Sequence, residues 1–307
     1  MIQIKNIATI IILAVTVLSC NSQAKPNPNI ETARQGSFKI TADESFKPII
    51  DSQIAVFLSE YPNIKITVDY KPEAECFAAL ENDSSTRLII TTRDLSKDEY
   101  YNLKLKFPVG IMSDKVANDG IAVIMHPSAK DTMLSRRDLK EILLNTSKYK
   151  YQAVFDGKRQ TSSLRFMLDS VLGQAELPPN ARGLDSTKAV IDFVAKNPNS
   201  IGFVGVSWIG NDQDEEQLSF LRKVKIASIL CEKCAYPSYK KPYQANIATK
   251  QYSLVRGLYY IVKNDQGGVA TNFAKWLEQE RGQLIFKVAY LVPTKMNVFV
   301  EATEVVR

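Results

Sequence analysis

Short apolar runs rich in β-branched residues alternate with amphipathic stretches in the first third of the chain, and this alternation restricts the fold more than any other feature. The pattern predicts a strand, a helix, a strand, a helix and a strand, in that order, over residues 37–41, 46–61, 64–70, 73–81 and 87–91. The capping box Ser96-x-x-Glu99 then opens another helix. Repeated strand–helix–strand units favour a mainly parallel sheet with helices on both faces. We therefore expect one α/β lobe here.

A second unit of the same kind is predicted further along the chain. Residues 120–125 form an apolar strand long enough to run out of the first lobe into a neighbour. Helices and strands then alternate over residues 135–144, 151–155, 162–172, 186–196 and 200–205, before a return strand over 254–263 and closing helices over 268–290. Ser135-x-x-Asp138 is a second capping box, residues 178–180 are predicted to be a loop, and residues 211–216 an acidic surface turn. The predicted fold class is α/β, with two Rossmann-like lobes of mainly parallel sheet joined by two crossover segments.

The chain length agrees with two lobes. A chain of 307 residues is long enough for two domains, each with a core of its own. The pattern places lobe 1 at residues 36–119 and 256–307, and lobe 2 at residues 120–255. Any hinge movement between them is expected near Asp119-Gly120 and near Val255-Arg256-Gly257, where the chain crosses.

The N-terminus has the pattern of a secretion signal. Lys5 precedes the apolar residues 7–18, a stretch too short to cross a bilayer as a helix, which takes roughly 20 residues. Residues 1–19 are therefore predicted to be a signal peptide. Because Cys20 directly follows Val-Leu-Ser, the site resembles a bacterial lipobox, in which this cysteine is acylated. The polar residues 20–35 would then form a lipidated tether; a plain secretory signal is the alternative.

Composition narrows the classes of function. The formal net charge is +6, but the basic residues are scattered among acidic ones, so nucleic-acid binding is not expected. His126 is the one histidine of the chain, and no nucleophile motif such as G-x-S-x-G accompanies it. No metal-ligand cluster is evident in the sequence either. We therefore expect no enzymatic activity and no cofactor.

Three cysteines follow Cys20 in the chain. Cys231 and Cys234 form a C-x-x-C pair in a chain with a secretion signal, so a local disulfide is expected. A redox role is the weaker alternative, because the pair is followed by Ala-Tyr-Pro and not by a helix. A zinc site would need two more ligands, which no second cysteine pair supplies. Cys76 is interpreted as a small buried hydrophobic residue.

Hydroxyl-bearing residues lie where predicted strands run into helices. Helix N-termini offer free backbone N–H groups, so such junctions suit anions, although serine and threonine there are more often simple helix caps. Three junctions stand out, and a cleft shared between them would hold a small oxyanion. Their candidate ligand-binding residues are Ser45 and Phe46 at the first, Thr92 and Arg93 at the second, and Asp156, Thr161, Ser162, Ser163 and Arg165 at the third.

The order and spacing of several segments resemble one known family. They are similar to the phosphate-binding, periplasmic solute-binding subunits of bacterial phosphate ABC importers, in the class II periplasmic-binding-protein superfamily. The likeness spans residues 36 to about 293. Its landmarks are Ile40-Thr41-Ala42 with Ser45-Phe46, Leu88 to Leu95, Asp119 to Ile124, Ser135 to Leu144, Asn199 to Val204, Leu254 to Tyr260, and Gly282-Gln283 through Val292-Pro293.

The resemblance implies roles for particular residues and also shows two departures. It implies that Ser45, Phe46, Ser162 and Ser163 donate hydrogen bonds to phosphate. The family's glycine-serine-glycine-threonine turn is replaced here by Gln-Thr-Ser-Ser ending at Ser163. The second departure is Arg93, which stands where an aspartate would accept the phosphate proton, so Asp156 is the alternative acceptor. Glu73 and Glu75 fall where the family has small donors, and pairing of Arg93 with Glu75 is one hypothesis for their charge.

These observations predict an extracytoplasmic, periplasm-facing lipoprotein of the membrane surface. It would bind phosphate or a similar small oxyanion between its lobes and deliver it to the permease of an ABC importer, or report its presence. The alternative is an interaction or structural lipoprotein that keeps the two-lobed fold but has lost or changed its small ligand. A phosphatase would need a metal cluster or an activated nucleophile, and the sequence shows neither.

Overall fold

A computed structural model describes residues 31–107, 110–157, 161–173, 176, 178–211, 213–263 and 267–297. The predicted signal peptide, the lipidation site Cys20 and most of the tether lie outside the described residues. Within them, no helix is both long and apolar enough to cross a membrane.

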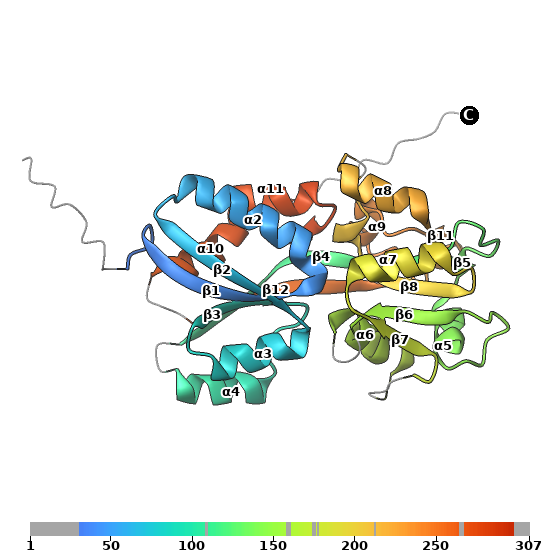
Figure 1. Cartoon of the computed structure of the whole chain (residues 1–307), viewed down its shortest axis with the longest axis horizontal. Coiled ribbons are helices and arrows are strands. Elements are labelled where there is room, and N and C mark those ends of the chain that lie inside the picture. Colours follow the sequence, from blue (N-terminus) through green and yellow to red (C-terminus); the bar gives the residue numbers. More distant parts are fainter. Residues whose placement is uncertain are drawn as a thin grey trace, which may run out of the picture.

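The first lobe is a twisted α/β sandwich on the left of Figure 1. Strand β1 pairs in parallel with both β2 and β3, and the returning strand β12 pairs antiparallel with β3. Helices α2, α10 and α11 cover one face of this sheet, and α3 and α4 cover the other. The elements are β1 (Gly36–Asp43), the short helix η1 (Glu44–Phe46), α2 (Lys47–Glu60), β2 (Ile64–Lys71), α3 (Glu73–Asn82), β3 (Thr86–Thr91), α4 (Lys97–Lys106), β12 (Val255–Lys263), α10 (Val269–Glu278) and α11 (Glu280–Val288).

The second lobe repeats the same layering. Strand β6 pairs parallel with both β7 and β8, with α7 and α8 on one face and α5 and α6 on the other (Figure 1). A small separate sheet of β5, β10 and β11 lies at its outer end. The elements are β5 (Met133–Leu134), α5 (Arg136–Leu143), β6 (Gln152–Asp156), α6 (Ser162–Met167), a π-helical turn (Leu168–Leu172), β7 (Ala181–Leu184), α7 (Thr187–Lys196), β8 (Ser200–Gly205), η3 (Val206–Trp208), α8 (Glu215–Lys223), β9 (Lys225–Ile226), β10 (Ser228–Leu230), β11 (Tyr239–Lys240) and α9 (Gln244–Ala248).

Two long strands join the lobes. Strand β4 (Ile111–Met125) pairs antiparallel with β12 up to Gly120, and from Ile121 onward it pairs with β8 of the second lobe. The short strand β13 (Val292–Pro293) also pairs with β4, at residues 117 and 118. The expected fold class, two α/β lobes joined by two crossover segments, is confirmed. The residue boundaries of the lobes stay a prediction.

Apolar side chains from the helices fill the space on both faces of the sheets. In lobe 1, the rings of Phe57, Phe273 and Trp276 meet edge to face, with centroids 5.0 and 5.7 Å from Phe57. Cys76 is fully buried beside Leu80 on the opposite face, as expected of a small hydrophobic residue, and burial raises the pKa of its thiol. These cores hold each lobe rigid, so the strand ends that face the other lobe are fixed in place.

The capping signals read from the sequence form as predicted. Ser96 and Glu99 make a reciprocal capping box at the start of α4, and Ser135 and Asp138 make another at the start of α5. The C-x-x-C pair is a disulfide between Cys231 and Cys234.

Several short elements were not predicted. Strand β7 follows the predicted loop at residues 178–180, and the predicted acidic turn over residues 211–216 ends at Asp214, which caps helix α8. Helix α9 and the two- and three-residue strands of lobe 2 were also missed. Helix α9 contacts lobe 1, because the Gln244 side chain donates to the backbone carbonyl of Lys287 in α11 at 3.0 Å.

Candidate functional site

A buried ion pair lies in the crossover strands. Arg256 on β12 and Asp119 on β4 are paired in the sheet register, and the Arg256 Nε atom lies 2.8 Å from the Asp119 Oδ2 atom. Both side chains are almost completely buried, at 2% and 0% exposure. Burial raises the pKa of Asp119, but the guanidinium and the backbone N–H of Val206, 3.1 Å from Oδ1, stabilise its carboxylate. Both partners therefore lie in the crossover strands as an ion pair.

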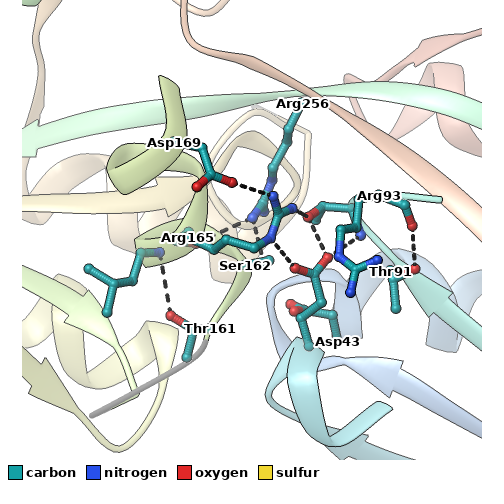
Figure 2. Close-up of polar contacts among 12 residues, drawn as sticks. Asp43, Thr91, Arg93, Thr161, Ser162, Arg165, Asp169 and Arg256 are labelled. Carbon is teal, nitrogen blue, oxygen red and sulfur yellow. Dashed lines mark hydrogen bonds and ion pairs between the residues drawn. The ribbon is translucent and has the colours of Figure 1, made fainter. Parts of the chain in front are cut away.

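Serine hydroxyls from both lobes converge on this arginine (Figure 2). Arg256 Nη2 donates to Ser45 Oγ at 3.0 Å, while Nη1 donates to Ser162 Oγ at 2.7 Å and to Ser163 Oγ at 3.4 Å. Ser45 comes from lobe 1, and the other two begin helix α6 of lobe 2. The guanidinium also lies over the ring of Phe46, 4.7 Å from its centroid. One buried cation thus orders hydroxyl groups from the two facing lobes.

Local backbone structure aims these hydroxyls. Asp43 ends β1 and caps the short helix that follows, accepting from the backbone N–H of Ser45 at 2.9 Å and from its hydroxyl. In lobe 2, Thr161 is the N-cap of α6, and the hydroxyl of Ser162, the first residue of that helix, lies 3.2 Å from the Ser45 hydroxyl of lobe 1. Gly157 turns the chain after β6 with a φ of +89°, and a Cβ there would collide with Thr161 at 2.3 Å.

A glycine makes room for the central ion pair. A Cβ at Gly205, the last residue of β8, would lie 3.0 Å from Arg256 Nη2 and 3.1 Å from Asp119 Oδ2. A larger residue would push the pair apart. The sequence places this glycine at the point where the sheet of lobe 2 meets the crossover strands.

A second arginine, Arg165 of α6, reaches across from lobe 2 to lobe 1. Its Nε atom lies 2.5 Å from Glu73 Oε2, and its Nη2 atom donates to Thr92 Oγ1 at 2.7 Å. The backbone N–H of Thr92 donates to Glu73 Oε1 at 2.7 Å, as does the Thr92 hydroxyl at 2.5 Å. Burial opposes ionisation of Glu73, but Arg165 and Thr92 outweigh it and hold the pKa of this carboxyl below its usual value.

Further hydrogen bonds join the lobes around the central arginine. The Trp208 indole N–H donates to the backbone carbonyl of Ser45 at 2.8 Å, and the Ser207 hydroxyl donates to the same carbonyl at 3.3 Å. Thr187 Oγ1 of lobe 2 donates to Glu44 Oε2 of lobe 1 at 3.2 Å. The lobes are therefore closed over the site.

Two buried carboxyls border the serines and keep oxygens without a partner among the described residues. These are Oδ2 of Asp43 and Oδ1 of Asp156. Burial raises the pKa of Asp156 to about 8, reinforced by the charge of Asp43 and opposed by Arg256. Burial also raises the pKa of Asp43, again against the effect of Arg256. Each carboxyl therefore has a buried oxygen available for a hydrogen bond with a ligand.

Most of the residues predicted from the sequence meet in this region. Ser45, Phe46, Ser162 and Ser163 contact Arg256, Asp156 lies beside them, and Thr161 caps the helix that carries the two serines. Thr92 and Arg165 lie in the adjoining contact with Glu73, so there the hydroxyl and the guanidinium have protein partners.

Arg93 has partners outside the central cluster, and its predicted pairing with Glu75 is wrong. Its guanidinium makes two contacts with Glu99, of 2.7 and 2.8 Å, and lies 3.7 Å from the centroid of Phe77. Glu99 is the better partner because it is held at the start of α4 by the capping box with Ser96.

Three residues at the centre were missed as site residues. Arg256 and Asp119 were predicted only as positions where the chain crosses, and Asp43 was passed over as part of a loop. The available signal was a single arginine inside the apolar segment Leu254 to Tyr260, because a charge in a buried strand requires a partner.

Among the residues that the structure describes, no group of three or more His, Cys, Asp or Glu side chains is arranged to hold a metal ion.

Two α/β lobes, joined by two crossover strands and closed over a buried set of anion-type donors, define a type II periplasmic-binding fold. The chain belongs to the PBP superfamily: residues 27–280 match the model of the PBP superfamily domain.

Individual relatives agree with this assignment. The chain is 25% identical over 280 residues to the phosphate-binding protein PstS of Bacillus subtilis, covering 87% of this chain and 84% of the relative. A Clostridium perfringens protein, described as a phosphate ABC transporter substrate-binding protein with bound phosphate, superposes with a TM-score of 0.68 at 17% identity, over 85% of this chain and 100% of the other. An ABC-type phosphate transport receptor from Vibrio cholerae gives 0.62 at 18% identity, over 84% and 100%. At 17% and 18% identity, these two structural matches establish the fold alone.

Proposed function

We propose that this protein is an extracytoplasmic solute-binding protein that clamps phosphate between its two lobes. The observation that carries the proposal is the buried Arg256, whose guanidinium reaches hydroxyls of Ser45, Ser162 and Ser163 from both lobes. A tetrahedral oxyanion stripped of water needs such a set of convergent, charge-assisted donors. In this proposal the ligand replaces the serine–arginine contacts.

The carboxyl groups favour phosphate among oxyanions. Asp43 and Asp156 each present a buried oxygen that has no partner among the described residues. An oxyanion that carries its own proton can donate to such an oxygen when the carboxyl is ionised and accept from it when the carboxyl is protonated, whereas a fully ionised oxyanion can only accept. Phosphate carries a proton at neutral pH. The Bacillus subtilis relative, whose name is that of a phosphate-binding protein, supports the same ligand.

Binding, and not catalysis, is the proposed activity. The site's serines are held by an arginine, which cannot act as a general base, because it stays protonated in proteins. Closure and opening would move the lobes about β4 and β12, with the boundaries near residues 119–120 and 255–257.

The proposed setting is the outer face of a membrane, with delivery of phosphate to the permease of an ABC importer. Acylation of Cys20 would anchor the chain through its N-terminus. Intact mass of the protein purified from a bacterial membrane tests this: a diacyl or triacyl adduct is expected on the wild-type chain and absent in Cys20→Ala. An unmodified wild-type mass would contradict the lipid anchor.

Isothermal titration tests the ligand. The full chain in mild detergent, freed of bound ligand by unfolding and refolding in phosphate-free buffer, is titrated with phosphate, sulfate and molybdate. Saturable one-to-one binding of phosphate is expected. A folded protein that binds none of these oxyanions would overturn the proposal and favour an interaction lipoprotein that retains only the fold.

A further inference from the structure

Glu73 already occupies donors of the kind that an oxyanion requires. Its carboxylate accepts from the backbone N–H and the hydroxyl of Thr92 in lobe 1, and from Arg165 in lobe 2. It is only 2% exposed, whereas the Arg165 side chain is 31% exposed. This is the environment of a bound anion, supplied by the protein itself.

The buried charges of the closed site cancel in pairs. Arg256 is matched by Asp119 at 2.8 Å, and Arg165 is matched by Glu73 at 2.5 Å. Asp169 also contacts Arg165, at 2.9 Å, but it is 57% exposed and is screened by solvent.

The other acids around the site favour their neutral forms. Burial raises the pKa of Asp43, of Glu44 and of Asp156. Within the two ion pairs, the charges of Arg256 and Arg165 are balanced by those of Asp119 and Glu73. Glu73 decides this balance, because without it Arg165 would add one uncompensated positive charge.

We propose that Glu73 sets which charge of oxyanion the site accepts. By neutralising Arg165 inside the closed lobes, it leaves the Arg256–Asp119 pair and uncharged donors to hold the ligand. The site then favours an oxyanion that carries a proton over one that is fully ionised. This inference rests on the proposed phosphate-binding role, and it names Glu73 as the residue that determines selectivity without being a ligand.

Phosphate and sulfate have the same tetrahedral shape, but only phosphate carries a proton at pH 7. Comparing the two anions therefore tests selectivity for charge. Titration of the full chain at pH 7 with each anion gives a ratio of affinities. In Glu73→Gln, whose amide oxygen can still accept from Thr92, the preference for phosphate over sulfate is expected to fall at least about tenfold, because one buried positive charge is gained. In Arg165→Gln, where Glu73 is left uncompensated, the preference is expected to rise by a similar factor.

The double variant Glu73→Gln/Arg165→Gln distinguishes an effect of net charge from an effect of losing the side-chain contacts. It removes both charges, so its preference is expected to return to within about threefold of the wild type. Glu81→Gln is the matched control, because Glu81 lies on the same helix, pairs with Lys106 at the surface and is 46% exposed. Its preference should equal that of the wild type. Thermal unfolding of each variant checks that it is folded.

Each negative outcome has a distinct meaning. If the wild type binds no phosphate, the proposed function fails. If the wild type binds phosphate but the single variants keep its preference, or the double variant shifts as far as Glu73→Gln, Glu73 does not set the charge selectivity. If Glu73→Gln is unfolded, the opposite shift in Arg165→Gln still decides: an unchanged preference there overturns the inference.

Discussion

Two arginine–carboxylate pairs lie at the junction of the lobes, and they join different parts of the molecule. Arg256 and Asp119 sit on neighbouring crossover strands, opposite each other in the register. Arg165 and Glu73 sit on helices of opposite lobes, 92 residues apart in the chain. Figure 2 labels both arginines; we expect only the second pair to separate if the lobes open, because its partners come from opposite lobes.

The difference indicates a division of roles. Because Arg256 and Asp119 lie opposite each other on paired crossover strands, we expect this ion pair to persist when the lobes open. We expect a pair between the lobes to form only when they close, so in our proposal Arg165 and Glu73 affect both lobe closure and the charge of the oxyanion that is bound. Burial follows the same division, since Arg256 is 2% exposed and Arg165 is 31% exposed.

Removing the hinge arginine should have the largest effect. Arg256→Gln leaves Asp119 buried without a counter-charge, which is expected to lower the free energy of unfolding by about 3–5 kcal/mol and to abolish phosphate binding. Urea unfolding and titration calorimetry measure the two effects. Arg93→Gln is the matched control: its pair with Glu99 is about one-third exposed, so the expected loss is below about 1 kcal/mol. Wild-type affinity in Arg256→Gln would contradict the site.

The two serines at the start of α6 provide a finer test. Ser162 lies 2.7 Å from Arg256 Nη1 and Ser163 lies 3.4 Å from it. Ser162→Ala is expected to lower phosphate affinity about ten- to a hundredfold, because a hydrogen bond to a charged group contributes about 1.5–3 kcal/mol. Ser163→Ala should lower it less. Equal affinities in both variants and the wild type, measured by titration calorimetry, would rule out this loop.

Asp156 predicts a pH dependence of stability. Its pKa is about 8 in the fold and 3.8 in an unperturbed chain, so the folded state binds the proton more tightly. The stability that this proton contributes is complete below about pH 4 and is lost as pH rises toward 8, by up to about 1.4 kcal/mol per pH unit. Urea unfolding of the ligand-free protein between pH 4.5 and 8 should show a smaller decline in Asp156→Asn. The exposed Asp98→Asn serves as control; identical slopes in all three proteins would refute the assignment.

The Arg165–Glu73 pair should have the smallest effect on the free energy of unfolding and the largest effect on how far the lobes open. Replacing both partners in Glu73→Gln/Arg165→Gln leaves no unmatched charge, so the expected change in unfolding free energy is about 1 kcal/mol or less. The ligand-free double variant should nevertheless populate open lobes more, giving a larger radius of gyration in X-ray scattering than the wild type. Identical scattering would show that the pair does not hold the lobes together.

Local patterns were sufficient to predict the fold. Strand and helix order followed from hydrophobic periodicity, and two helix starts followed from the capping boxes at Ser96 and Ser135. Elements of two to five residues, such as β7 and α9, were missed because they are too short to show a period.

The site was predicted only in part, because its centre depends on distant contacts. Ser45 and Ser162 were found through their place at strand–helix junctions, which is a local signal. Arg256 meets Asp119, 137 residues earlier, and only the sheet register brings them together. Arg93 was misjudged for a related reason: Glu99 is a better partner than Glu75 once α4 has formed.

A crystal structure of the ligand-stripped protein after addition of phosphate tests the central claim most directly. The account predicts one phosphate between the lobes, with its oxygens within hydrogen-bond distance of Arg256, Ser45 and Ser162, while Arg256 keeps its contact with Asp119 and Arg165 keeps Glu73. A phosphate bound elsewhere, or a cleft in which Arg256 still contacts only protein groups at saturating phosphate, would contradict it.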